Sequence, residues 1–305
     1  MNSRRLHGLV AATHTPFRAD GSMDLAVVER QAEHLKAGGV GYVFVGGTTG
    51  ESASLTVEER RLLTQRWSEV VPGSGLGLVV HVGANCIADS RALAAHAESV
   101  GAVAISALAP SYFKPRSLEV LIACCAEVAS AAPATPFYYY DIPALTGVSF
   151  PMVDFLEKAP EKIPTLAGLK FTNPDLMAYQ FCLRSGGGRW DLPFGVDEHF
   201  LGALAMGARG AVGSGFNFAA PIYRRLLAAF GRGDLEAARV EQFRGAQLVQ
   251  VLVRYGYMGG AKAVMEMLRV SVGPARLPNT SLDAAQKARL RAELEALGFF
   301  EWVRA

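Results

Sequence analysis

The chain has 305 residues, 50% of them hydrophobic, so it is long enough to bury a large core. Its 30 basic and 28 acidic residues leave a formal net charge of +2 at pH 7, which gives no strong attraction to nucleic acid or to an anionic membrane. We therefore expect neither as a partner. The sequence contains no uninterrupted run of about 18 apolar residues, so we expect no membrane span.

The N-terminal stretch and the cysteines predict where the protein resides. Residues 1–17 are basic but contain no long apolar segment, so we expect no signal peptide. The cysteines, which form no CxxC pair and have no histidine at zinc-ligand spacing, are Cys86, Cys124, Cys125 and Cys182. The simplest interpretation is reduced, buried thiols in a cytoplasmic protein without a metal site.

Short apolar runs predict eight β-strands, which in chain order are residues 9–17, 42–47, 78–83, 102–108, 136–143, 166–171, 191–196 and 210–215. These runs are nearly continuous rather than alternating, which is typical of parallel strands buried on both faces. Helical segments are expected between them, with starts near Asp24, Thr56, Ala88, Ser117, Pro151, Pro174 and Glu198. The segment from Asp24 ends at a glycine pair, and Glu59 lies three residues after Thr56, which predicts a capping box.

About eight strand–helix units favour an α/β fold closed as a TIM (β/α)8 barrel over an open sheet. We predict the barrel over residues 1–220, with its active site at the C-terminal ends of the strands. From about Pro221 the pattern is helical to the end of the chain. Because this tail is too long for barrel closure alone, residues 221–305 are predicted to form a C-terminal helical subdomain packed on the barrel.

Lys170 ends an otherwise apolar strand in the run LAGLKF. Burying an ammonium group is costly, so we expect this site to favour the neutral amine. A neutral amine can attack a ketone and form an imine, which then accepts electrons. The alternative is a lysine whose flexible side chain reaches solvent at the strand end.

Tyr140 ends another predicted strand, in the run FYYYDIP. Because side chains alternate along a strand, at least one of the three consecutive tyrosines should point into the barrel. A phenol at that position could relay protons. Tyrosines on strands are more often packing residues, so this residue alone does not decide between the two roles.

A glycine-rich run, GGTTGES, follows the strand at 42–47. Gly47 and Gly50 permit tight turns that expose backbone N–H groups, and Thr48 and Thr49 add hydroxyl groups. Together these groups could hold a carboxylate. An ordinary turn between strand and helix would have the same composition.

Polar residues also follow the last two predicted strands. Asp197 and Glu198 could bind a polar substrate, or could cap the next helix. Ser214 could hydrogen-bond a polyol, or could simply belong to a turn. All these candidates converge on the same face of the predicted barrel.

At these residues the sequence resembles the dihydrodipicolinate synthase/N-acetylneuraminate lyase superfamily, and the resemblance covers nearly the whole chain. The runs that carry it are GTTGES, HVGA, PFYYYDIPALTGV, KIPTLAGLKFTNPDL and FGVDEHFLGALAMGARGAVGS. Within the superfamily they are most similar to the sialate lyases, particularly the animal-type branch. The resemblance implies a class I Schiff-base lyase or aldolase that cleaves N-acetylneuraminate reversibly to N-acetylmannosamine and pyruvate.

The resemblance also implies a role for each matching residue. Lys170 matches the Schiff-base lysine and Tyr140 the proton-shuttling tyrosine. Thr48 and Thr49 match the pair that holds the pyruvate carboxylate, with Thr48 also in the proton relay. Tyr112 matches an aromatic position that completes the site of a neighbouring subunit. The positions that match contacts to the sugar tail are Thr172, Gly195, Asp197, Glu198 and Ser214.

Leu145 helps to separate the activities within the superfamily. Dihydrodipicolinate synthases usually carry an arginine at this position, which binds the carboxylate of their second substrate, and leucine cannot form that pair. Two residues depart from the sialate lyase pattern, Asp141 after the tyrosine and His199 after Glu198. Neither removes a catalytic group, but both bear on the sugar specificity.

Three alternatives for the activity therefore remain open. The first is action on another 2-keto-3-deoxy sugar acid by a lyase, aldolase or dehydratase of the same superfamily, the second is dihydrodipicolinate synthase, and the third is a non-catalytic binding protein on the same barrel. We expect a small-molecule substrate and no cofactor beyond the imine on Lys170. The resemblance implies a homotetramer.

Overall fold

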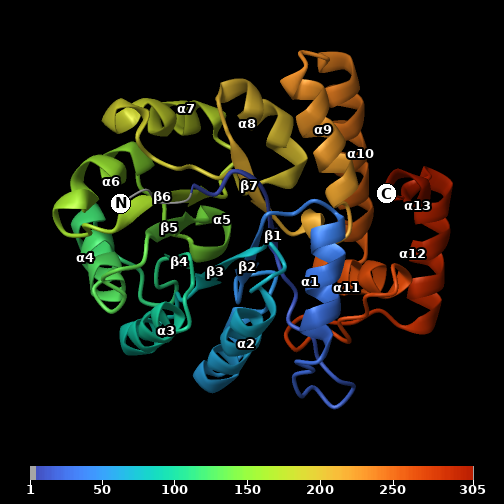
Figure 1. Cartoon of the computed structure of the whole chain (residues 1–305), viewed down its shortest axis with the longest axis horizontal. Helices are drawn as coiled ribbons and strands as arrows, with labels where there is room; N and C mark the ends of the chain where they lie inside the picture. The colour runs from blue at the N-terminus through green and yellow to red at the C-terminus, as the bar shows by residue number, and fades with distance from the viewer. Residues whose placement is uncertain (1–4, 305) are drawn as a thin grey trace.

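Parallel strands surrounded by helices make up most of the chain in the computed structural model, which describes residues 5–304 (Figure 1). Residues 1–4, part of the stretch considered for a signal peptide, lie outside the described residues. The strands are β1 (Gly8–Ala12), β2 (Tyr42–Val45), β3 (Gly77–His81), β4 (Ala104–Ala107), β5 (Phe137–Asp141), β6 (Leu166–Phe171) and β7 (Gly210–Gly213). Their order is β6-β5-β4-β3-β2-β1-β7, and every pair is parallel.

The run predicted as the seventh of eight strands, residues 191–196, closes the barrel without forming a regular strand. Asp191 bridges to Gly168 of β6, and Phe194 bridges both to Phe171 of β6 and to Ala211 of β7. Pro193 has no N–H to donate, so the ladder here consists of separate hydrogen bonds. The predicted TIM barrel is thus confirmed, with this one position filled by bridges.

The helices follow the strands as the sequence predicts. They are α1 (Val27–Ala37), α2 (Val57–Val70), α3 (Ile87–Ser99), α4 (Leu118–Ala129), α5 (Pro143–Thr146), α6 (Met152–Lys158), α7 (Leu176–Arg184), α8 (Phe200–Met206), α9 (Ala220–Gly231), α10 (Leu235–Arg254), α11 (Tyr257–Met267), α12 (Ala284–Leu297) and α13 (Phe299–Trp302). The capping box of Thr56 and Glu59 is present at the start of α2. No helix within residues 5–304 combines the length and the apolar character needed to span a membrane.

The C-terminal helices α10 to α13 lie together on one side of the barrel, next to α9 (Figure 1). The expected helical pattern is interrupted between α11 and α12, where residues 268–283 are irregular. This segment runs back to the barrel, because Phe17 N donates to the carbonyl oxygen of Val272. The irregular segment therefore joins the helical tail to the C-terminal ends of the strands.

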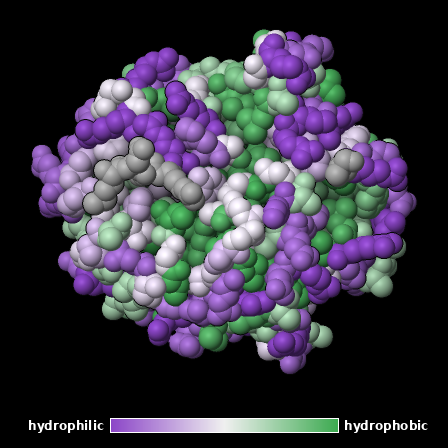
Figure 2. Space-filling view, in the orientation of Figure 1, coloured by the Kyte–Doolittle hydropathy of each residue, from purple (hydrophilic) through white to green (hydrophobic). Residues whose placement is uncertain are grey.

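The core has two parts, as expected for a barrel covered by helices. A small cluster fills the interior of the barrel; its buried members are Leu6, Val10, Ala12, Phe44, Val79, Ala104, Tyr138, Tyr140, Ile142 and Val212. A much larger cluster packs between the strands and the helices. On the face in Figure 2, hydrophilic side chains cover most of the rim, while apolar ones are visible between the helices and toward the centre.

Candidate active site

Lys170 lies near the C-terminal end of β6, where a TIM barrel carries its active site. It pairs in register with Tyr140 of β5, so the two side chains point the same way, into the barrel. Only 4% of Lys170 is exposed to solvent. The alternative of a lysine that reaches bulk solvent is therefore wrong.

Two aromatic rings surround the Lys170 amine. Its Nζ lies 4.1 Å from the ring centroid of Phe44 and 3.9 Å from that of Tyr140. Within residues 5–304, Nζ makes no hydrogen bond and no ion pair, so the amine faces ring surfaces rather than a carboxylate. This contact also tells us that Tyr140 packs against the amine through its ring, which leaves the phenol free for other partners.

The phenol of Tyr140 reaches the glycine-rich loop. Its oxygen is 3.3 Å from Thr48 Oγ1, a hydrogen bond that either group can donate. Thr48 is exposed while Thr49 is buried, so the two threonines play different structural roles. The structure thus brings Lys170, Tyr140 and Thr48 together from three separate segments of the chain.

A buried ion pair holds the end of this loop. Glu51 adopts the left-handed conformation, with φ of 55°, which is unusual for a residue other than glycine. Its Oε1 lies 2.6 Å from Nζ of Lys262 on α11, and Lys262 also donates to the carbonyl oxygens of Thr15 and Pro274. Burial is the main cause that lowers the pKa of Lys262, and Glu51 opposes it. The pair connects the loop directly to the C-terminal helices.

Sequence analysis missed Glu51 and Lys262 as a pair. A signal was present for each one: Glu51 belongs to the GTTGES run, and Lys262 stands among small and apolar residues in GGAKAV, much as Lys170 does. What the sequence did not reveal is that residues 211 positions apart meet.

Asp197 is buried beside the barrel mouth. Its Oδ2 accepts a hydrogen bond of 2.6 Å from Gly215 N. A Cβ atom at Gly213 would overlap the carboxylate, so that position requires glycine. Burial raises the pKa of Asp197 to about 7, partly opposed by the hydrogen bond from Gly215 and by the charge of Lys170. Asp197 is therefore a carboxyl group that can be protonated near neutral pH.

The other predicted sugar-tail residues lie around Asp197 in the same part of the barrel. Ser214 Oγ is 2.6 Å from the hydroxyl of Tyr257, a residue of α11 that sequence analysis missed. Thr172 Oγ1 is buried without a hydrogen-bond partner in the described part of the chain, and a Cβ at Gly195 would overlap it. Glu198 is half-buried.

Three residues discussed from the sequence are exposed to solvent. Tyr112 is 79% exposed, and its ring contacts that of Phe113 with centroids 5.0 Å apart. Among residues 5–304, neither a hydrogen bond nor a ring contact joins Tyr112 to Lys170, Tyr140 or Thr48. Leu145 is 63% exposed on α5, and His199 is exposed after Asp197.

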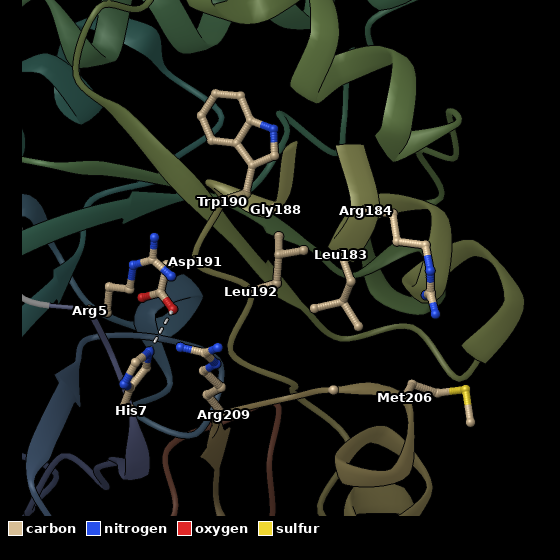
Figure 3. A pocket seen from close by; sticks show the side chains of 11 residues that line it. Arg5, His7, Leu183, Arg184, Gly188, Trp190, Asp191, Leu192, Met206 and Arg209 are labelled. Carbon is tan, nitrogen blue, oxygen red and sulfur yellow. Dashed lines mark ion pairs between the residues drawn. The ribbon is translucent and has the colours of Figure 1, made fainter. Parts of the chain in front are cut away.

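A separate cavity of about 380 Å³ lies at the opposite end of the barrel, at the N-terminal ends of the strands (Figure 3). Asp191 stands in it, 4.0 Å from His7 Nε2. The carboxylate accepts hydrogen bonds from Leu6 N and from the Tyr138 hydroxyl, which close this end of the barrel. None of the predicted site residues lines the cavity, so it is not the candidate active site.

Potential metal ligands do not gather around the lysine. In the part of the chain that the structure describes, no three His, Cys, Asp or Glu side chains are arranged to hold a metal ion. The four cysteines are free thiols, but the expectation that all are buried is wrong, because Cys86 is exposed and Cys124 is half-buried. The pKa values of Cys125 and Cys182 are raised, mainly by burial, to about 12 for Cys182.

The fold and the site define a TIM-barrel protein with a buried lysine beside a tyrosine and a Gly-Thr-Thr loop at the C-terminal ends of its strands. Residues 5–297 match the model of the dihydrodipicolinate synthetase family, and the chain belongs to that family. The superfamily resemblance seen in the sequence is confirmed.

Individual relatives give a finer comparison. The chain is 39% identical to the N-acetylneuraminate lyase of Mus musculus over 300 residues, which cover 97% of this chain and 94% of that protein. Among solved structures, the Proteus mirabilis N-acetylneuraminate lyase superposes with a TM-score of 0.94 at 42% identity, covering 97% of this chain and all of that one. The sialic acid aldolase of Aliivibrio salmonicida matches with a TM-score of 0.94 at 40% identity, covering 97% and 98%.

Proposed function

We propose that this protein is a carbon–carbon lyase that cleaves N-acetylneuraminate reversibly to N-acetylmannosamine and pyruvate through an imine on Lys170. One observation carries the proposal: the buried Lys170 amine lies against the ring of Tyr140, whose hydroxyl is hydrogen-bonded to Thr48. Curated and solved N-acetylneuraminate lyases at about 40% identity over nearly the whole chain support the substrate.

Lys170 begins the reaction by attacking the C2 ketone, and loss of water gives a protonated imine. As the C3–C4 bond breaks, its electrons enter the imine and form an enamine, while the C4 hydroxyl loses its proton. The Tyr140 phenol relays that proton, with Thr48 as its hydrogen-bond partner. Protonation of the enamine at C3 and hydrolysis of the imine then release pyruvate and restore the amine.

The loop after β2 binds the carboxylate of the keto acid. We assign this role to Thr48 and Thr49 together with the backbone N–H groups of their loop. Glu51 and Lys262 fix the end of the loop, so the loop is held in place before the substrate arrives.

The sugar tail requires several hydrogen-bonding partners because it carries several hydroxyl groups. We assign it to the groups around Asp197, and add Tyr257 because its hydroxyl bonds Ser214. The predicted members of this set are Thr172, Gly195, Asp197, Glu198 and Ser214. The protonated imine acts as the electron sink, so we propose no further cofactor.

We also propose a homotetramer, in which Tyr112 completes the site of a neighbouring subunit. Its support is the exposure of large apolar residues, which in soluble proteins mark interaction surfaces. The exposed residues include Tyr112 and Phe113, whose rings contact each other, and Met177 and Phe181, which line one surface pocket. The cytoplasmic location stays a prediction.

Release of pyruvate from a panel of acids tests the proposed function. We expect cleavage of N-acetylneuraminate with a kcat/KM at least about tenfold above that for 2-keto-3-deoxygluconate, because only the longer substrate uses all the sugar-tail groups. Faster cleavage of the shorter acid would favour the alternative within the same superfamily. Formation of dihydrodipicolinate would contradict the assignment, as would the absence of pyruvate release from any acid.

A further inference from the structure

His81 is a buried histidine to which the proposed reaction assigns no role. It is the last residue of β3 and only 1% exposed. Its Nδ1 lies 2.9 Å from the carbonyl oxygen of Gly46, at the start of the glycine-rich loop. Arg60 Nη2, which can only donate, also lies 3.3 Å from Nδ1, but it already donates at 2.7 Å to the carbonyl oxygen of His81. Because the Gly46 carbonyl oxygen can only accept and makes the shorter contact, we assign the proton to Nδ1, which leaves Nε2 as an acceptor.

Arg60 of α2 holds the backbone at His81 and just after it. It donates to the carbonyl oxygen of His81 at 2.7 Å and to that of Gly83 at 2.9 Å. Burial and the charge of Arg60 hold the pKa of His81 well below its ordinary value, so the imidazole is neutral. A neutral ring in one tautomer is suited to holding its neighbours in place, and not to proton transfer.

The same ring contacts the phenol side of the site. The His81 and Tyr140 rings meet edge to face, with centroids 5.8 Å apart and an interplanar angle of 90°. The Tyr140 ring in turn covers the amine of Lys170. His81 therefore touches both halves of the site. It contacts the glycine-rich loop of residues 46–52, here called the carboxylate loop, through Gly46, and the lysine–tyrosine pair through Tyr140.

The histidine is a poor choice for stability alone. Nε2 is buried without a hydrogen-bond partner in the described part of the chain, and so is the hydroxyl of Ser106, which pairs in register with His81. Buried polar atoms without partners are rare and destabilising, so each one calls for a reason. An apolar ring would fill the same space without an orphaned nitrogen.

We propose that His81 is a positioning residue for this site, which holds the carboxylate loop through the Gly46 carbonyl and orients Tyr140 by its ring edge. This inference rests on the proposed lyase function. The two contacts of His81 should have different effects. The Nδ1 hydrogen bond affects binding of the keto acid, whereas the ring contact affects the proton transfer that uses the Tyr140 phenol.

Two substitutions separate these effects. His81→Asn keeps a donor near the position of Nδ1 and removes the ring edge. His81→Phe keeps an aromatic edge against Tyr140 and removes the donor. His96→Asn on α3 is the matched control, since within residues 5–304 the ring of His96 makes one hydrogen bond, with the carbonyl oxygen of Arg61.

The affinity for pyruvate is read from the concentration dependence of borohydride trapping, and kcat from cleavage of N-acetylneuraminate. For His81→Phe we expect pyruvate affinity to fall about tenfold with kcat within about threefold of the unsubstituted protein. For His81→Asn we expect the reverse, with affinity retained and kcat about tenfold lower. Melting temperatures should stay within about 4 °C of the unsubstituted protein.

Equal changes in both variants, or no change in either, would overturn the positioning role, as would a His81→Asn variant that loses affinity for pyruvate. If His81→Phe does not fold, the Asn variant alone decides, by whether its kcat falls while its affinity stays. If the unsubstituted protein neither forms the adduct nor releases pyruvate, the proposed function itself has failed.

Discussion

Tyr140 and Lys170 face each other across neighbouring strands, in register, with the lysine Nζ 3.9 Å from the centre of the tyrosine ring. This arrangement places a ring face against the amine and puts the phenol hydroxyl at the far edge of the ring, 3.3 Å from Thr48 Oγ1. One residue thus shapes the environment of the nucleophile and supplies the hydroxyl for proton transfer. Removing the phenol oxygen of Tyr140 alone should separate these two functions.

Tyr140→Phe removes the phenol and keeps the ring. We expect kcat for cleavage to fall by about 10²- to 10⁴-fold, because proton relay is lost, while pyruvate still forms an imine with Lys170. Cleavage kinetics and borohydride trapping on the same sample measure both. A variant that cleaves normally would assign the relay to another group.

Lys170→Met removes the amine and keeps an unbranched side chain between Phe44 and Tyr140. We expect cleavage to fall by at least about 10⁴-fold, because no imine can form. The fold should remain intact, since the change also removes a buried amine that has no hydrogen-bond partner among residues 5–304. Circular dichroism and thermal melting check this, and turnover near that of the unsubstituted protein would rule out covalent catalysis by this lysine.

Lys262→Met breaks the buried ion pair and leaves Glu51 without its cation. We expect a loss of about 3–5 kcal/mol in the free energy of unfolding, because a buried carboxylate then lacks a counter-charge. Adding Glu51→Gln to the same chain should recover part of this loss. Denaturant unfolding of the two single variants and the double variant measures the coupling, and additive losses would show that the pair does not act as a unit.

Asp141 should make stability depend on pH. Burial raises its pKa from 3.8 to about 7, partly opposed by a hydrogen bond from Asn173. Between these pH values the folded state binds more protons than the unfolded state, so this carboxyl stabilises below about pH 4 and its contribution is lost as pH rises to about 7.

Asp141→Asn removes this dependence. Its free energy of unfolding, minus that of the unsubstituted protein, should rise between pH 4 and pH 7 by up to about 4 kcal/mol and then level off. Urea unfolding at a series of pH values measures the difference. A difference that stays flat would mean that Asp141 ionises normally in the folded state.

Much of the barrel could be predicted from the sequence because its strands are continuous apolar runs and its helices carry local start and stop signals. Thr56 with Glu59 is such a local signal, and the capping box formed as predicted. The strand at 191–196 was harder, because Pro193 breaks the hydrogen-bond ladder while the chain still follows the path of a strand. The irregular residues 268–283 depend on contacts with the distant N-terminal segment, which local patterns do not contain.

The residues of the site likewise divide into those that the sequence predicts and those that it does not. Lys170, Tyr140 and Thr48 could be proposed because each stands at the end of a strand, and strand ends meet at one face of a barrel. Lys262 and Tyr257 lie on α11, far along the chain, and only the packing of that helix brings them to Glu51 and Ser214. His81 belongs to an otherwise apolar strand, and the sequence does not predict its contact with Gly46, which depends on how two strands pack.

Covalent trapping tests the central claim most directly. The protein is incubated with pyruvate and borohydride, digested, and examined by mass spectrometry, with Lys170→Met as the control. The reduced imine should add one stable mass to the peptide that contains Lys170, and the control should stay unmodified. An unmodified Lys170, or an adduct on another lysine, would contradict the account.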